Sequence, residues 1–233
     1  MIKKQEKDLF EEWKANRGYS SFMADGLFDE REWKKQSVKI LYVLKEANWE
    51  NGNRDLCEYL LSEQSPTYWK TWNNIARWTQ AIQCGGEYQR EITKADKTKW
   101  LKKIAILNIK KVGGGARANN EQIREYGQRD AVYIKRQIEL YQPDIIICCG
   151  RGNGKNADIL YRYVFQGGYQ WEKKNGGYNY FMATLDTLRR IPVVSFRHPQ
   201  IWGGHEKFQK CYYDMVQIAE ELRNREQLLS MEK

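Results

Sequence analysis

Four short apolar runs divide the chain and predict buried β-strands. They cover residues 38–44, 104–107, 145–149 and 192–196. Each run is continuously apolar rather than alternating, which is typical of parallel strands that are covered on both faces.

Helical patterns separate these runs. Residues 68–82, 120–141 and 205–229 each place apolar side chains on one side of a helix. Because strands and helices alternate, we predict right-handed βαβ units and a three-layer α/β/α sandwich around a central four-stranded, mainly parallel sheet. Asp130 falls on the apolar stripe of the 120–141 helix, so we expect a buried carboxylate with a structural role.

Two further segments lie outside this pattern. Residues 1–35 predict a helical N-terminal extension that packs on a single domain spanning residues 1–233. Residues 167–184 predict an inserted hairpin or loop that turns at residues 175–177 (Asn-Gly-Gly). No stretch of about 20 mostly apolar residues is present, so we expect no membrane partner.

Composition narrows the class of protein. The 9 Trp and 15 Tyr among 233 residues exclude a disordered chain. The five cysteines include no CxxC pair, and Cys148 and Cys149 stand inside an apolar run, so we expect buried thiols rather than a disulfide framework. The first residues lack the apolar stretch of a signal peptide. We therefore expect a cytoplasmic protein.

The net charge of +9 is concentrated in two segments. Residues 94–117 carry eight basic groups against one acidic group, and residues 151–198 carry eight against three. The rest of the chain sums to −3. Such concentration predicts a basic face that binds a nucleic-acid backbone. A solvated, lysine-rich helix is the alternative interpretation.

The carboxyl ends of the four predicted strands are all polar. They comprise residues 45–49, 108–111, 150–156 and 197–200. In open α/β sheets, ligands bind beyond the carboxyl ends of the strands, so we expect the functional site there.

The glycine-rich segment 150–156 follows a predicted strand and precedes a helix, as a phosphate-binding loop does. Its glycine spacing is one residue short of the Walker pattern, and Asn156 replaces the Ser or Thr that would bind magnesium. We therefore predict a tight strand-to-helix turn whose amides face a DNA phosphate, and no nucleotide hydrolysis.

The chain has two histidines, and they differ in position. His205 begins the last predicted helix, whereas His198 follows the last predicted strand. We expect a structural role for His205 and a catalytic one for His198, because catalytic groups gather at strand ends in this class of fold. The spacing of His198, His205 and Cys211 does not match a zinc site, so we expect no metal ion.

Taken together, the four strand ends resemble the uracil-DNA glycosylase superfamily, over roughly residues 36–220. The first motif of that superfamily, Gly-x-Asp/Asn/Glu-Pro, corresponds to residues 45–48, which keep an acidic residue and lack the Gly and Pro. Asn108 matches the Asn that ends the second strand, and Gly150 matches the Gly after the third. His198, followed by Pro199, matches the His-Pro of the last motif and is the most specific element.

The resemblance implies a monomeric DNA glycosylase without cofactor, which hydrolyses the N-glycosidic bond of uracil or a related damaged base. In that reaction Asn108 reads the Watson–Crick edge, and His198 donates a hydrogen bond to the departing base oxygen. Glu46 or Asn48 positions the attacking water. Trp49 stacks on the base.

The implied partner is single- or double-stranded DNA. Ile201 or Trp202 would fill the hole that the flipped base leaves. The side chains expected at the DNA backbone are Lys110, Lys111, Arg151, Lys155, Arg197 and Gln200.

Departures from the superfamily pattern leave several functions open. The first motif lacks its Pro, and Gln200 stands where the superfamily has Ser. Either change is compatible with a different damaged base, a weak enzyme or a fold kept for nucleic-acid binding alone. A nucleoside or nucleotide N-glycoside hydrolase is a third possibility. The cysteine spacing does not fit the iron–sulfur cluster of some superfamily branches.

Overall fold

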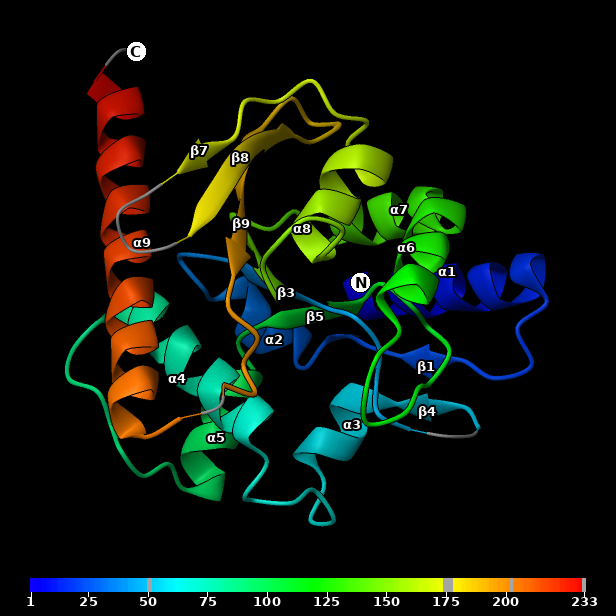
Figure 1. Cartoon of the computed structure of the whole chain (residues 1–233), viewed down its shortest axis with the longest axis horizontal. Helices are drawn as coiled ribbons and strands as arrows, with labels where there is room; N and C mark the ends of the chain where they lie inside the picture. The colour runs from blue at the N-terminus through cyan, green and yellow to red at the C-terminus, as the bar shows by residue number, and fades with distance from the viewer. Residues whose placement is uncertain (50–51, 174–177, 202, 232–233) are drawn as a thin grey trace.

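The computed structural model describes residues 1–49, 52–173, 178–201 and 203–231. Its centre is a mixed β-sheet in the order β2-β5-β3-β6-β9-β8-β7 (Figure 1). A second, two-stranded sheet pairs β1 with β4. The strands are β1 Met23–Ala24, β2 Gly26–Leu27, β3 Ile40–Leu44, β4 Arg54–Asp55, β5 Ala105–Asn108, β6 Ile145–Cys149, β7 Glu172–Lys173, β8 Asn179–Thr184 and β9 Arg190–Phe196.

Helices cover both faces of the central sheet. They are α1 Ile2–Arg17, α2 Glu30–Lys34, α3 Leu56–Leu61, α4 Lys70–Cys84, α5 Lys94–Leu101, α6 Asn120–Arg129, α7 Ala131–Tyr141, α8 Asn156–Ile159 and α9 His205–Met231, with a π-helical turn at Leu160–Val164. Figure 1 shows α4, α5 and α9 on one side of the sheet and α1, α6 and α7 on the other.

Alternate side chains of the central strands belong to two apolar cores. In β3, Leu41 and Val43 pack with residues of α1 and α7, whereas Tyr42 and Leu44 pack with residues of α4 and α9. The same alternation runs through β5, β6 and β9. The chain is therefore an α/β protein whose mostly parallel central sheet is buried on both faces.

The four predicted strands are confirmed at the centre of the sheet as β5, β3, β6 and β9, all parallel. The expected number of strands was too small, because β2, β8 and β7 extend the sheet with antiparallel pairing. β2 has only two residues, too few for a periodic signal. β7 and β8 form the hairpin expected within residues 167–184, and its expected turn at residues 175–177 lies outside the described residues.

Residues 120–141 form two helices instead of the expected single one, because the helix is interrupted at Asp130. The Asp130 side chain is fully buried and accepts hydrogen bonds from Tyr19 and, over 2.9 Å, from Arg17 Nε. The buried position expected for this carboxylate is confirmed.

The N-terminal residues 1–35 contribute to the core and to the central sheet. Helix α1 packs against α7 and buries Leu9, Phe10 and Trp13 there. Strand β2 pairs with β5 at one edge of the central sheet.

All five cysteines lie among the described residues and are free thiols. Cys148 and Cys149 are fully buried, as expected. In the described part of the chain, no helix has the length and apolar character that crossing a membrane requires.

Candidate functional site

The segments that follow β3 and β5 continue side by side beyond the sheet. The two strands pair in register as far as Asn108. Past that point the amide of Lys110 donates to the carbonyl of Lys45 over 2.9 Å, and Asn48 forms a parallel bridge with Gly114. This extension places the first predicted motif beside the loop that follows β5.

A cavity of about 570 Å³ opens at these strand ends. The volume lies within the range of small-molecule binding sites. The cavity brings together the predicted residues Glu46, Asn48, Trp49, Asn108, His198 and Gln200.

Asn108 lines the cavity from the end of β5, although the residue is only 1% exposed. Its Nδ2 donates to Asp25 Oδ2 over 3.2 Å, and its backbone N–H donates to the same oxygen over 2.7 Å. Only the nitrogen of an amide can donate to a carboxylate, so this contact fixes the orientation of the side chain. Oδ1 of Asn108 is buried and has no hydrogen-bond partner among the described residues. A ligand that donates to Oδ1 would satisfy it.

Glu46 is held in an ion pair at the cavity wall. Its Oε2 accepts from Lys110 Nζ over 2.6 Å, and the two side chains are 5% and 6% exposed. Lys110 also donates to Gln122 over 2.9 Å. Gly114 packs against the carboxylate so closely that a Cβ there would lie 2.2 Å from Glu46 Oε2. These contacts hold the carboxylate in one orientation.

His198 presents a hydrogen-bond donor. The backbone N–H of Gln200 donates to His198 Nδ1 over 3.1 Å. A neutral imidazole that accepts at Nδ1 carries its proton on Nε2, which is then free to donate to a ligand. Desolvation by the surrounding chain, and then the charge of Lys45, lower the pKa of His198 from its ordinary value of 6.5. The lowered pKa of His198 therefore favours the neutral ring at pH 7.

Buried side chains of α4 hold the loop that carries His198. Asn74 donates from Nδ2 to the carbonyl of Pro199 over 2.7 Å. Arg77 in turn donates to Asn74 Oδ1 over 3.1 Å. The His-Pro segment is thus anchored to a helix as well as to β9.

Aromatic side chains form another part of the wall, namely Trp49, Tyr59, Tyr68, Trp69 and Trp72. Trp49 packs edge-on against Tyr59, with ring centroids 5.2 Å apart. The guanidinium of Arg54 lies 3.9 Å from the centroid of Trp49 and covers one of its faces. Of these residues only Trp49 was expected at the site. The density of aromatic residues within residues 59–72 is the sequence signal that indicates the others.

Lys45 adds positive charge beside His198. Its Nζ donates to Asn120 Oδ1 over 2.7 Å. Burial, and then the charge of Lys155, lower the pKa of Lys45, while Glu46 opposes that change. Lys155, expected at the DNA backbone, therefore lies close enough to Lys45 for their charges to interact.

Two lysines expected at the DNA backbone are buried instead. Lys111 is fully buried, and its Nζ donates to both carboxylate oxygens of Asp25 over 2.7 Å. Lys110 is paired with Glu46. A phosphate would reach either lysine only after these ion pairs had broken, so the structure contradicts a phosphate-binding role for both.

The remaining candidates for phosphate contact stay closer to solvent. Arg151 is exposed, and Lys155 and Arg197 are partly exposed. Burial raises the pKa of Cys211, and the charges of Arg197 and Arg151 oppose that rise. Both arginines therefore lie near this residue of α9.

Gln200, expected at the DNA backbone, and Ile201 and Trp202, the expected wedge residues, have different positions. Gln200 is exposed at the cavity. Ile201 is half-buried and packs against the core. Trp202 lies outside the described residues.

The basic segment 94–117 uses part of its charge inside the molecule. Lys97 is 1% exposed and donates to the carbonyl of Pro66 over 2.9 Å. At the surface, Lys94 forms an ion pair with Glu63, which neutralises a further charge. Together with the two buried lysines, these contacts make the basic face smaller than the sequence suggested.

The glycine-rich segment forms the expected strand-to-helix turn between β6 and α8, with positive φ at its three glycines. The amide of Gly154 donates to Asp158 over 2.9 Å and is not free for a phosphate. Asn156 is fully buried and donates to backbone carbonyls of β3 and β6, which ties the turn to the sheet.

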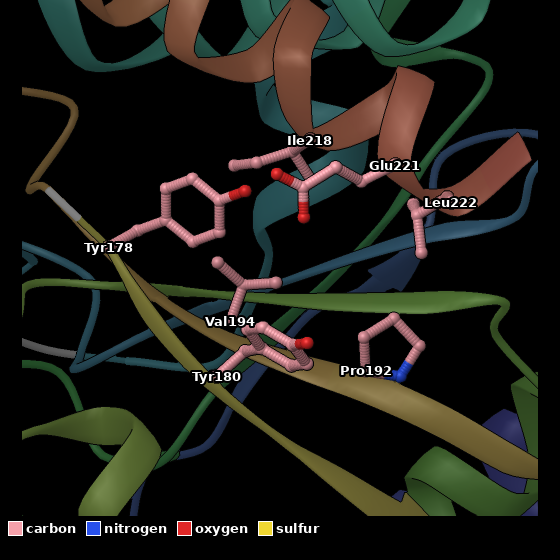
Figure 2. A pocket seen from close by; sticks show the side chains of 7 residues that line it. All are labelled: Tyr178, Tyr180, Pro192, Val194, Ile218, Glu221 and Leu222. Carbon is pink, nitrogen blue, oxygen red and sulfur yellow. The ribbon is translucent and has the colours of Figure 1, made fainter. Parts of the chain in front are cut away.

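A second hollow, of about 20 Å³, lies between α9 and the strands β8 and β9. Figure 2 shows Tyr178, Val194 and Ile218 around it. A space of this size holds about one water molecule, so we interpret it as a packing gap. Within the described residues, no group of three or more His, Cys, Asp and Glu side chains could hold a metal ion.

No protein-family model matches the chain, and no curated protein matches it either. The interpretation of the site therefore depends on its own geometry. One cavity combines a buried acceptor on Asn108, a donor on His198 and the carboxylate of Glu46.

Proposed function

We propose that the chain is a DNA glycosylase of the uracil-DNA glycosylase superfamily, acting on uracil or a related damaged base. The observation that carries the proposal is the cavity shared by Asn108, His198 and Glu46, which come from three different strand ends. The parallel strand order β5-β3-β6-β9 and the helices on both faces suit the α/β/α sandwich of that superfamily.

Base recognition begins with the acceptor on Asn108. A base that leaves the stack loses its pairing partner, at a cost of a few kcal/mol, and must find new partners in the pocket. In our proposal the ring N–H of uracil donates to Asn108 Oδ1. The aromatic wall supplies apolar contacts to the base and the sugar.

His198 stabilises the leaving base. As the N-glycosidic bond breaks, its electron pair stays with the base, and negative charge develops on the base oxygens. The Nε2–H of a neutral His198 donates to one of these oxygens in a preorganised position. The bond from Gln200 to Nδ1 holds the required tautomer.

Glu46 acts on the attacking water. The water oxygen forms the new bond to the sugar carbon, and its proton passes to the carboxylate. The ion pair with Lys110 keeps the carboxylate oriented for this step. Asn48, which also lines the cavity, is the second contact for the water.

A second candidate is a nucleoside or nucleotide N-glycoside hydrolase. Burial of Lys110 and Lys111 favours it, because it removes two of the expected contacts to a DNA backbone. The two candidates differ in salt dependence. Binding through several phosphates weakens steeply with log salt, whereas binding of a nucleoside does not.

The test is single-turnover cleavage of labelled oligonucleotides that carry uracil, hypoxanthine or xanthine, with alkali to reveal abasic sites. We expect cleavage by the wild type and a loss of about 10²–10³-fold in His198→Ala, the usual cost of removing one such donor. Asn108→Ala should also lose cleavage. His205→Ala is the matched control, because this exposed histidine begins α9 outside the cavity.

Failure to cleave any of these oligonucleotides would contradict the proposal. Release of free base from nucleosides or nucleotides under the same conditions would then support the second candidate.

A further inference from the structure

Asp25 lies directly beneath Asn108, in the link between β1 and β2, and is fully buried. Its Oδ1 accepts from Lys111 Nζ over 2.7 Å and from Gln137 Nε2 over 2.8 Å. Its Oδ2 accepts from Lys111 Nζ and from the backbone N–H of Asn108, each over 2.7 Å, and from Asn108 Nδ2 over 3.2 Å. Both carboxylate oxygens are thus saturated by buried donors.

The side chains that hold Asp25 are themselves held by buried hydrogen bonds. Gln137 also donates to Tyr141, whose hydroxyl donates to Glu6 over 2.6 Å. At Gly26 a Cβ would lie 2.1 Å from Glu6 Oε2, so only glycine fits. Hydrogen bonds from Tyr141 and Gln137 of α7 therefore hold Glu6 and Asp25 of the N-terminal segment in place.

We propose that Asp25 is a positioning residue, which holds the Asn108 amide so that its oxygen, rather than its nitrogen, is offered to the ligand. The proposal rests on the proposed function and deepens it. Nδ2 of Asn108 is committed to Asp25, and the partnerless Oδ1 points away from that carboxylate. The cavity thereby requires a donor on the ligand.

This orientation defines a class of bases. Uracil, hypoxanthine and xanthine carry a ring N–H on the Watson–Crick edge, and they are the deamination products of cytosine, adenine and guanine. Cytosine and adenine present a ring nitrogen that only accepts. Placing that acceptor against Asn108 Oδ1 would leave two buried acceptors facing each other, which is unfavourable. The Asn108 orientation held by Asp25 would therefore disfavour cytosine and adenine. Thymine and guanine, which also carry a ring N–H on that edge, would not be excluded by this contact.

The test compares uracil with cytosine, which have the same ring size. Their binding as free bases is followed by quenching of tryptophan fluorescence, since Trp49, Trp69 and Trp72 line the cavity. We expect the wild type to prefer uracil by about tenfold or more, the usual effect of an unsatisfied buried polar group. The double variant Asp25→Asn/Lys111→Met removes both charges, and its new amide can donate to Asn108 Oδ1 and let Asn108 turn. Its preference should fall to below about threefold.

Asp130→Asn is the matched control, because Asp130 is an equally buried carboxylate that does not line the cavity. If Asp25 had a purely structural role, the double variant would bind both bases more weakly by the same factor. The ratio of the two affinities would then stay as in the wild type, which is also the result expected for the control. An unchanged ratio in the folded double variant would overturn the inference, and so would a wild type that binds neither base or binds both equally.

If the double variant does not fold, a measurement on the wild type tests the inference instead. By NMR, the side-chain amide protons of Asn108 should exchange with solvent far more slowly than those of exposed Asn119. Equal exchange rates would overturn the inference. Preference for uracil without cleavage of any oligonucleotide would instead contradict the proposed function alone.

Discussion

Lys110 and Lys111 are neighbours in the chain, yet their side chains enter two different ion pairs. Lys111 and Asp25 are both fully buried beneath Asn108. The side chains of Lys110 and Glu46 are 6% and 5% exposed, and Glu46 lines the cavity. The first pair holds Asn108, which is proposed to read the base. The second pair contains Glu46, which is proposed to act on the attacking water.

The difference shows how one type of contact serves two purposes. Buried charges are costly unless they are paired and fully hydrogen-bonded, so the sealed pair beneath Asn108 is tightly coupled to folding. Because Glu46 lines the cavity, water in the cavity can replace a lost partner of its carboxylate. Breaking the Lys110–Glu46 pair should therefore cost less stability and change the reaction more directly.

The largest expected effect on stability is that of Lys111→Met. The substitution leaves Asp25 as an unpaired charge in a fully buried position, which typically costs about 3–5 kcal/mol. Urea unfolding measures the change in the free energy of unfolding. A loss smaller than that of Lys110→Met would contradict the comparison of the two pairs.

Lys110→Met should lower the free energy of unfolding by about 1.5–3 kcal/mol, the usual value of a hydrogen bond to a charged group. Because Glu46 then loses its orientation, single-turnover cleavage should slow by about tenfold or more, given that acid–base groups contribute about 10²–10⁴-fold. Glu46→Gln provides the comparison, since it removes the carboxylate itself. Wild-type cleavage in both variants would exclude this ion pair from the reaction.

Gly114→Ala tests the close contact over Glu46. The new methyl group would lie 2.2 Å from the carboxylate and must displace it, at a cost of about 1–3 kcal/mol. Gly115→Ala is the matched control, because a Cβ there meets no atom within 4 Å. Urea unfolding and cleavage rates should both change in the first variant and remain close to wild type in the second.

The pH dependence of His198 should have the mildest effect on stability. The pKa of His198 is lowered from 6.5 by desolvation and by Lys45, so the folded protein binds this proton less readily than the unfolded chain. Stability from the neutral ring is thus present above pH 6.5 and is lost as the pH falls through the lowered pKa.

The cleavage rate should follow the same titration, level at pH 7–8 and falling about tenfold per pH unit below the pKa. Protonation would place an N–H on Nδ1 opposite the N–H of Gln200. His198→Gln keeps a donor without a titrating ring, so its profile should lack this fall. An identical acidic fall in that variant would assign the titration to another group.

The central strands were predictable because each is a continuous apolar run buried on both faces. Their ends were predictable in turn, since parallel strands place their carboxyl ends along one edge. For that reason Asn108 and His198 were correctly expected in one region. Strand β2 was not predictable, because its two residues pair with β5 only through the folded sheet.

Burial of Lys110 and Lys111 could not be seen in the sequence. A run of lysines usually indicates a solvated surface, and Lys111 is buried only because Asp25, 86 residues away, meets it in the fold. The aromatic wall was missed for a related reason. Trp72 has the spacing of a core residue on α4, and the spacing does not show that it also borders a cavity.

The most direct test of the account is a crystal structure of the protein with uracil bound. We predict that the ring N–H of uracil lies within 2.7–3.2 Å of Asn108 Oδ1, with a base oxygen at similar distance from His198 Nε2, as ordinary hydrogen bonds require. Asn108 should keep its contact with Asp25. A base bound elsewhere, or an Asn108 amide turned to offer its nitrogen, would contradict the central claim.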